Sequence, residues 1–182
     1  MNDLLVFGCS FTYGQGLPDC NEKPWLKPSK LGYVELLGSE LDINVKNCSQ
    51  PGSSNLKILY KILNTDIDHD DSVLIQWSFS SRSYVFHEDE NENGDIGPWG
   101  GRDIIEKFYE IHSNRDLLMK SWLAIHYANL YLQTKCTKIY NLIISYDPLH
   151  KEIQPKWFDV KYFPISFHPN HLVFCADLLT PW

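Results

Sequence analysis

Short apolar runs alternate with amphipathic stretches along this chain, and the alternation predicts its secondary structure. Runs that are apolar, short and bounded by turn residues are typical of buried β-strands. Apolar residues that recur every three or four positions are typical of helices with one buried face. The predicted strands are residues 4–7, 43–48, 72–78 and 138–145. The predicted helices are residues 31–41, a helix that opens at residue 55, 104–111, 115–135 and a carboxy-terminal helix through 172–179.

The spacing of apolar residues also predicts which face of each helix is buried, because residues three or four positions apart share a face. In the helix over 31–41 the apolar set is Tyr33, Leu36, Leu37 and Leu41. In the helix that opens at residue 55 it is Leu56, Leu59, Ile62 and Leu63. In the helix over 115–135 it is Leu118, Trp122, Ile125, Asn129 and Leu132.

The composition narrows the class of protein. The 182 residues fit a single domain, residues 1–182, and 43% hydrophobic residues suffice for a full core. A net charge of −7 argues against nucleic acid and an anionic membrane as partners. Five cysteines without a C-x-x-C spacing favour a reducing compartment, and no apolar run approaches the roughly 20 residues that cross a bilayer. Because the first strand leaves no room for a signal peptide, we expect a cytoplasmic protein.

The most informative stretch is residues 8–14, where the first strand runs into a turn with Ser10 at its centre. Gly8 permits a sharp bend, and Ser10 and Thr12 are residue types that cap helix starts. A strand, a turn and a helix start place the Ser10 hydroxyl at the carboxyl edge of a sheet, where a helix dipole favours developing negative charge. A nucleophilic serine needs this setting. Thr12 replaces the second glycine of a G-x-S-x-G elbow, so the α/β-hydrolase pattern does not apply.

A second glycine turn follows the second predicted strand, with Gly52 behind Pro51. On its own, this motif has two interpretations. It is either a plain turn, or a turn whose glycine offers a backbone N–H at a helix start and lets a substrate come close. Together with residues 8–14 it resembles the SGNH (GDSL-like) hydrolases, whose first block reads G-x-S-x-T-x-G. In that family the second-block glycine, here Gly52, gives its N–H to the oxyanion hole. The final block places the catalytic histidine before Pro-Asn, here His168.

The third block of the family, G-x-N-D, is altered in this chain. Ser78 stands on its glycine, Ser80 on the asparagine that donates to the oxyanion, and Ser81 on its aspartate. A serine hydroxyl also donates a hydrogen bond, so the resemblance implies Ser80 as a third oxyanion donor, with Ser78 or Arg82 as fallback donors. Outright loss of one such donor typically costs about 10²–10³ in rate.

The catalytic aspartate of the family is also replaced, because Ile165 stands three residues before His168. The histidine is then oriented either by a backbone carbonyl near Ile165 or Ser166, which gives a Ser-His dyad, or by Asp147 at the end of the fourth strand. His171 is a spare candidate for the base, but the Pro-Asn pair follows His168.

The resemblance implies a flavodoxin-like three-layer α/β/α sandwich with a mostly parallel sheet. It implies a serine esterase that acts on a small-molecule or carbohydrate ester and needs no cofactor. The alternative is a catalytically impaired SGNH fold kept as a binding or structural module, such as a glycan-binding or phage accessory protein. A third interpretation, a nucleotide-binding protein, lacks a G-x-G-x-x-G or P-loop motif. The oligomeric state is left open by the sequence.

Three further stretches bear on the site. Residues 16–30 are predicted to form a loop that can lie over it. Residues 83–103 are the least regular part of the chain, either a lid or substrate platform with Trp99 stacking on a sugar, or a surface loop. Residues 66–71 are acidic but lack the glycine and glutamate of a calcium loop. We expect a solvated turn there, at the amino edge of the sheet.

Overall fold

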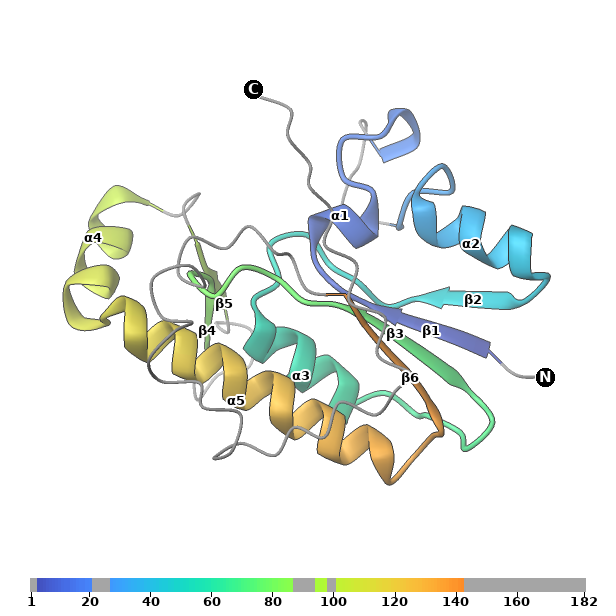
Figure 1. Ribbon diagram of the computed structural model, residues 1–182. Coiled ribbons are helices and arrows are strands. Elements are labelled where there is room, and N and C mark those ends of the chain that lie inside the picture. The colour runs from blue at the N-terminus through green and yellow to red at the C-terminus, as the bar shows by residue number, and fades with distance from the viewer. Residues whose placement is uncertain (1–2, 21–26, 87–93, 98–100, 143–182) are drawn as a thin grey trace.

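The computed structural model describes residues 3–20, 27–86, 94–97 and 101–142. Within these residues the chain builds a four-stranded parallel sheet in the order β2-β1-β3-β6 (Figure 1). Its strands are β1 (Asp3–Phe7), β2 (Asn44–Asn47), β3 (Ser72–Gln76) and β6 (Lys138–Leu142). The chain passes from β1 to β2 on one side and then to β3 on the other, so the carboxyl ends of β1 and β3 flank a switch point. Ligands bind at such points in open parallel sheets.

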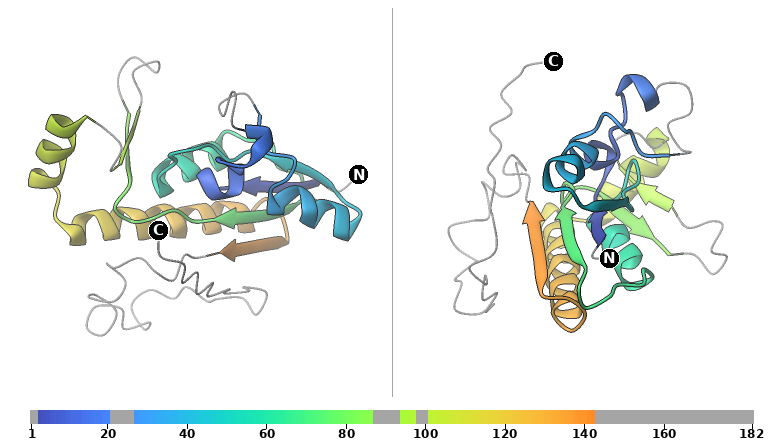
Figure 2. Two further views of the ribbon diagram at one scale, coloured as in Figure 1. Left: turned by 90° about the horizontal axis from the view of Figure 1, so that it is seen from above. Right: turned by 90° about the vertical axis from the view of Figure 1, so that its right-hand side faces the viewer.

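Helices cover both faces of the sheet and give three layers (Figures 1 and 2). One face is covered by α2 (Tyr33–Leu41), and the other by α3 (Asn55–Leu63) and α5 (Asn114–Gln133), which pack against each other. The shorter helical elements are α1 (Ser10–Tyr13), the 3-10 turn η1 (Pro18–Cys20) and α4 (Arg102–Ile111). The predicted α/β fold, with a parallel sheet between layers of helices, is confirmed.

Burial on both faces explains why the strands read as short, continuous apolar runs. In β1, Leu5 and Phe7 join the core on the side of α3 and α5, whereas Leu4 and Val6 join the core on the side of α2. The first core is the larger one. Its other fully buried members include Ile58, Ile62, Val73, Ile75, Trp77, Ala128 and Leu132. The expected face of α5 is confirmed, because its buried residues include Leu118, Ile125 and Leu132.

The buried face of α2 differs from the expected one. Val34 and Gly38 face the protein interior. Of the expected residues, Tyr33, Leu36 and Leu41 are exposed, whereas Leu37 packs partly buried against the core. The physical reason is a close approach to β2, since a Cβ added at Gly38 would lie 2.3 Å from Cγ2 of Val45. The helix therefore turns the side that lacks a side chain toward the strand. In α3, similarly, the expected Leu63 is exposed and Ile58 is buried in its place.

Part of the segment that was expected to be irregular forms a hairpin. Its strands β4 (Ser83–Val85) and β5 (Gly94–Ile96) pair antiparallel, apart from the main sheet. The side chain of Tyr84 is buried and packs on Tyr60 of α3, with ring centroids 6.3 Å apart. The described strands correct the expectation that this segment is irregular. A role of residues 83–103 as a lid or substrate platform stays a prediction, and Trp99 lies outside the described residues.

A nearly buried ion pair attaches this hairpin to the start of α3. The Nζ of Lys57 donates to Oδ2 of Asp95 at 2.6 Å, and the two side chains are 14% and 11% exposed. The other carboxylate oxygen of Asp95 accepts a hydrogen bond from the backbone N–H of Ser54 at 3.3 Å. Burial raises the pKa of Asp95, and the adjacent Lys57 opposes that rise. The hairpin is therefore held on the helix that follows the second glycine turn.

The acidic stretch at residues 66–71 lies at the amino edge of the sheet, as expected, but it is only partly solvated. Asp71 is buried, and its carboxylate accepts hydrogen bonds from the backbone N–H groups of Asp3 at 3.1 Å and Asp68 at 2.9 Å. These bonds give Asp71 a role in closing the turn before β3. Among the described helices, none has the length and apolar character needed to cross a membrane.

Candidate active site

Ser10 lies at the carboxyl edge of the sheet, directly after β1, and its side chain is half-buried. It is the first residue of α1, and the helix cap is Cys9, so the expectation that Ser10 or Thr12 caps this helix is wrong. The cap makes no side-chain hydrogen bond. Because α1 is a single turn, the helix dipole expected beside Ser10 is reduced to that of four residues.

The glycines and the threonine of the first turn are explained by close packing. A Cβ added at Gly8 would lie 2.1 Å from Oγ1 of Thr12, so only glycine leaves room for this buried side chain. Gly14 ends α1 in the left-handed conformation, with φ of 79°, and its N–H donates to the carbonyl oxygen of Ser10 at 3.0 Å. The G-x-S-x-T-x-G pattern therefore describes a compact turn that begins and ends at positions that require glycine.

The second glycine turn lies beside the first. After β2, the N–H of Cys48 donates to the carbonyl oxygen of Val6 in β1 at 2.8 Å, and the N–H of Gln50 donates to that of Gly8, just beyond β1, at 3.2 Å. The chain then turns through residues 50–53, with the N–H of Ser53 donating to the carbonyl oxygen of Gln50 at 3.3 Å. Gly52 has φ of 80° at the turn position that favours glycine. Ser54 follows and caps α3. The turns that carry Ser10 and Gly52 thus meet at one edge.

The third turn, after β3, directs its polar groups inward. Ser78 and Ser80 are 7% and 2% exposed. The side chain of Asn55 accepts from the N–H of Ser78 at 2.6 Å and donates to its carbonyl oxygen at 3.0 Å, as well as to the hydroxyl of Ser121. The guanidinium of Arg82 donates to Oγ of Ser78 at 3.0 Å. The expected third donor and its fallback donors are therefore buried or engaged in hydrogen bonds within this part of the protein.

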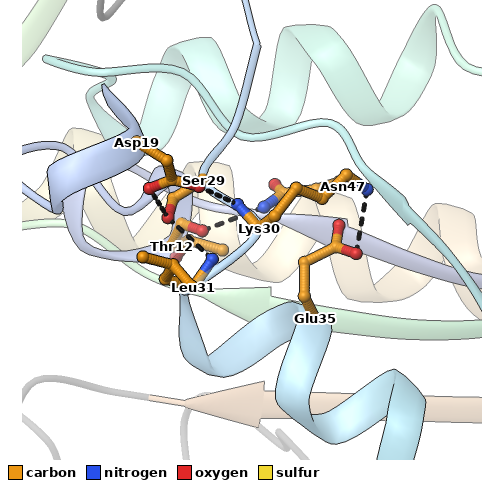
Figure 3. Close-up of polar contacts among 7 residues, drawn as sticks. All are labelled: Thr12, Asp19, Ser29, Lys30, Leu31, Glu35 and Asn47. Atoms are coloured by element: carbon orange, nitrogen blue, oxygen red, sulfur yellow. Dashed lines mark hydrogen bonds and ion pairs between the residues drawn. The ribbon is translucent and has the colours of Figure 1, made fainter. Parts of the chain in front are cut away.

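The first turn is also joined to the loop that follows it, and Figure 3 shows the polar contacts of that loop. The N–H of Ser29 donates to the carbonyl oxygen of Tyr13 at 2.8 Å. The carboxylate of Asp19 accepts from the hydroxyl of Ser29 at 2.5 Å and from the N–H of Lys30 at 2.6 Å. The hydrogen bond from Ser29 is the main cause that lowers the pKa of Asp19. The described ends of the loop are therefore fixed beside α1.

Three polar residues of this region were missed by sequence analysis. Asn47 ends β2, Gln76 ends β3, and Tyr33 begins α2. Each makes a side-chain hydrogen bond to Thr12 or to a partner of Thr12. The signal in the sequence is weak, because it consists only of a polar residue at the end of an apolar strand. Of the predicted site residues, Ser10, Gly52 and Ser80 lie on adjacent turns, whereas His168 and Asp147 lie outside the described residues.

Comparisons with known proteins support the fold. No protein-family model matches this sequence, and no curated protein matches it. Among solved structures, the chain is similar to a member of the lipolytic protein G-D-S-L family from Veillonella parvula DSM 2008, with a TM-score of 0.54 and 14% sequence identity. The match covers 96% of this chain and 79% of that one. A likeness at this identity shows a distant GDSL-like fold, in agreement with the resemblance in the glycine turns.

Proposed function

We propose that this protein is a serine ester hydrolase in which Ser10 is the nucleophile and His168 is the base. The observation that carries the proposal is the junction of the two glycine turns. The bond from the Gln50 N–H to the Gly8 carbonyl oxygen joins the turn of Ser10 to the turn of Gly52 at the carboxyl edge of the sheet. The G-D-S-L fold of the similar structure supports a hydrolase fold in general.

In the proposed reaction, His168 removes the hydroxyl proton of Ser10, and Oγ of Ser10 attacks the ester carbonyl carbon. The backbone N–H groups of Ser10 and Gly52 stabilise the oxyanion. The leaving alcohol takes the proton from the histidine, and water then releases the acyl group. Asp147, or a backbone carbonyl near Ile165, would orient the histidine. We propose a small-molecule or carbohydrate ester as the substrate.

Ser80 is proposed as a third oxyanion donor only if its hydroxyl becomes accessible to the substrate. Its side chain is 2% exposed, and it takes part in an interaction within the protein. The two backbone donors therefore carry most of the proposed oxyanion stabilisation. A site with fewer donors is expected to turn over more slowly than one with a complete set.

The test is hydrolysis of p-nitrophenyl acetate and butyrate by the wild type, Ser10→Ala and His168→Ala. Both substitutions are expected to lower kcat by more than about 10³-fold, because nucleophile and base act as a unit. Matched controls are Ser39→Ala, on the exposed side of α2, and His69→Ala, at the amino edge of the sheet. Both controls should hydrolyse at the wild-type rate. Equal background rates in wild type and all variants would contradict the proposal.

The alternative function, a glycan-binding module on an impaired SGNH fold, is favoured by one observation. The third turn uses its polar groups for hydrogen bonds within the protein. The side chain of Asn55 bonds to the backbone of Ser78, and Arg82 donates to the hydroxyl of Ser78. A glycan array probed with wild type and Ser10→Ala distinguishes the two functions. Equal glycan binding by both proteins, without ester turnover by either, would support the module.

A further inference from the structure

Thr12 connects the turn of the proposed nucleophile to the strands on both sides of β1. It is 1% exposed and lies two residues after Ser10. Its hydroxyl donates to Oε1 of Gln76, the last residue of β3, at 2.5 Å. Its carbonyl oxygen accepts from Nδ2 of Asn47, the last residue of β2, at 3.0 Å. The single turn of α1 is thus held from two neighbouring strands.

The two amides are themselves fixed in place. Oε1 of Gln76 also accepts from the hydroxyl of Tyr33 at 3.2 Å. The residue as a whole is exposed, but desolvation of its hydroxyl raises the pKa of that phenol. Oδ1 of Asn47 accepts from the backbone N–H of Ser49 at 3.1 Å and from its hydroxyl. Since Ser49 belongs to the segment that leads into the second glycine turn, Asn47 contacts both turns of the proposed site.

Apart from the contacts of Thr12, this turn is held by backbone hydrogen bonds, among them the bond from the N–H of Ser29 to the carbonyl oxygen of Tyr13. Helices of a few residues are marginal in water, and the cap of α1 makes no side-chain hydrogen bond. The packing of Thr12 on Gly8 places its side chain against the backbone just before Ser10. An apolar residue at position 47 would remove the amide that donates to the carbonyl oxygen of Thr12. An apolar residue at position 76 would remove the acceptor of the Thr12 hydroxyl and leave Tyr33, at 3.4 Å, as its other partner among the described residues. Hydrogen bonding to Thr12, and not only the filling of space, therefore explains why amide side chains occupy positions 47 and 76.

We propose that Gln76 and Asn47 are positioning residues of the active site, which fix Thr12 and through it the direction of the Ser10 hydroxyl relative to the Gly52 N–H. This inference rests on the proposed function. Neither amide is the nucleophile or an oxyanion donor, so its loss lowers kcat and leaves KM unchanged. A displacement of about 1 Å at a reacting group can cost about 10²-fold in rate.

The test compares Gln76→Leu with Gln76→Glu. The leucine removes the acceptor for Thr12, whereas the glutamate keeps a carboxyl oxygen in its place. For each variant we would measure kcat and KM on p-nitrophenyl acetate, thermal unfolding, and the rate at which a fluorophosphonate probe labels Ser10. In the labelling step, the serine oxygen bonds to phosphorus, fluoride leaves, and the base takes up the hydroxyl proton. We expect Gln76→Leu to lower kcat and the labelling rate by about 10–100-fold, and Gln76→Glu to restore both.

A second pair of variants tests the other strand. Asn47→Asp removes the donor to the Thr12 carbonyl and keeps the acceptor for Ser49. Asn44→Asp is its matched control, because the amide of Asn44 is exposed at the amino end of the same strand and donates to Asp3 at 2.8 Å. Asn47→Asp should lower kcat, and Asn44→Asp should match the wild type. If Gln76→Leu does not fold, Tyr33→Phe removes one donor to the Gln76 oxygen and should lower the labelling rate by a smaller factor.

Folded Gln76→Leu and Asn47→Asp proteins with wild-type kcat and labelling rates would overturn the inference. So would a rise in KM at constant kcat, because it would place the amides in substrate binding. In both cases loss of activity in Ser10→Ala would show that the proposed function still stands. A wild type that is neither labelled nor active would instead overturn the proposed function and this inference with it.

Discussion

The first two turns at the carboxyl edge of the sheet differ from the third in what they do with their polar groups. Ser10 and Gly52 are half-buried, and the hydrogen bonds that hold their turns involve neighbouring backbone groups and Thr12. In the third turn, by contrast, Ser78 and Ser80 are buried, and the hydroxyl and backbone of Ser78 are bound by other side chains.

The difference shows how the folding of a turn decides whether its polar groups can reach a substrate. A hydroxyl or N–H can act on a substrate only if the bonds that shape its turn are made by other groups. In the first turn Thr12 makes these bonds and leaves the Ser10 side chain half-buried. In the third turn Asn55 and Arg82 bond to Ser78 itself. The turns after β1, β2 and β3 all carry serine or glycine and look alike in sequence. In the structure they are not equivalent.

Among the changes that test the difference between the turns, the largest effect is expected from Gly8→Ala, which disrupts the first turn. The added Cβ would lie 2.1 Å from Oγ1 of Thr12, and the buried, hydrogen-bonded threonine has no room to move away. We expect a loss of about 1–3 kcal/mol in the free energy of unfolding from overpacking. Ester hydrolysis should fall by about 10²-fold, because the Ser10 turn is displaced. Urea unfolding and kcat measure the two effects.

The control for this substitution is Gly101→Ala. Among the described residues, nothing lies within 4 Å of a Cβ added at Gly101, and its φ is −60°, so the change should be tolerated. Hydrolysis at the wild-type rate by a folded Gly8→Ala protein would show that the position of the Ser10 hydroxyl does not depend on the packing of Thr12 on Gly8.

Asn55→Ala, at the third turn, is expected to have a smaller effect on the proposed activity. Its effect on stability should be clear. The substitution leaves the N–H and carbonyl oxygen of Ser78 without their partner in a buried place, at a cost of about 2–3 kcal/mol. Asn64→Ala, at the other end of α3, is the control. The amide of Asn64 is exposed, so its loss should cost about 0.5 kcal/mol or less. The measurement is urea unfolding of both variants. Equal stabilities would contradict a structural role for Asn55.

The smallest effect is expected from Ser80→Ala. Because the Ser80 hydroxyl is buried, its removal should lower kcat by less than about tenfold, against the 10²–10³ that loss of an oxyanion donor causes. Ser81→Ala, one residue further on and half-buried, is the control in the same p-nitrophenyl acetate assay. A fall of about 10² in Ser80→Ala alone would make Ser80 the third donor and remove the difference between the turns.

Most of the elements could be predicted from the sequence because their signals are local. The apolar run of β1 and the helical spacing in α5 depend on residues that are neighbours in the chain. The face that α2 buries was predicted wrongly, because apolar residues occur on several of its sides and the choice depends on the contact of Gly38 with Val45. The β4–β5 hairpin was missed because its strands have only three residues each and are held by distant contacts with α3.

For the candidate site, the sequence by itself determined the two glycine turns and the serine between them, because each is a short motif with its own backbone requirements. It also placed Ser10 and Gly52 after strands, and hence at the same edge of a parallel sheet. Only the tertiary structure decided which polar groups remain available. Asn47, Gln76 and Thr12 meet because β2 and β3 flank β1, and Asn55 reaches Ser78 because α3 begins beside the third turn. Such contacts depend on strand order and helix packing, which join residues far apart in the chain and leave no local pattern in the sequence.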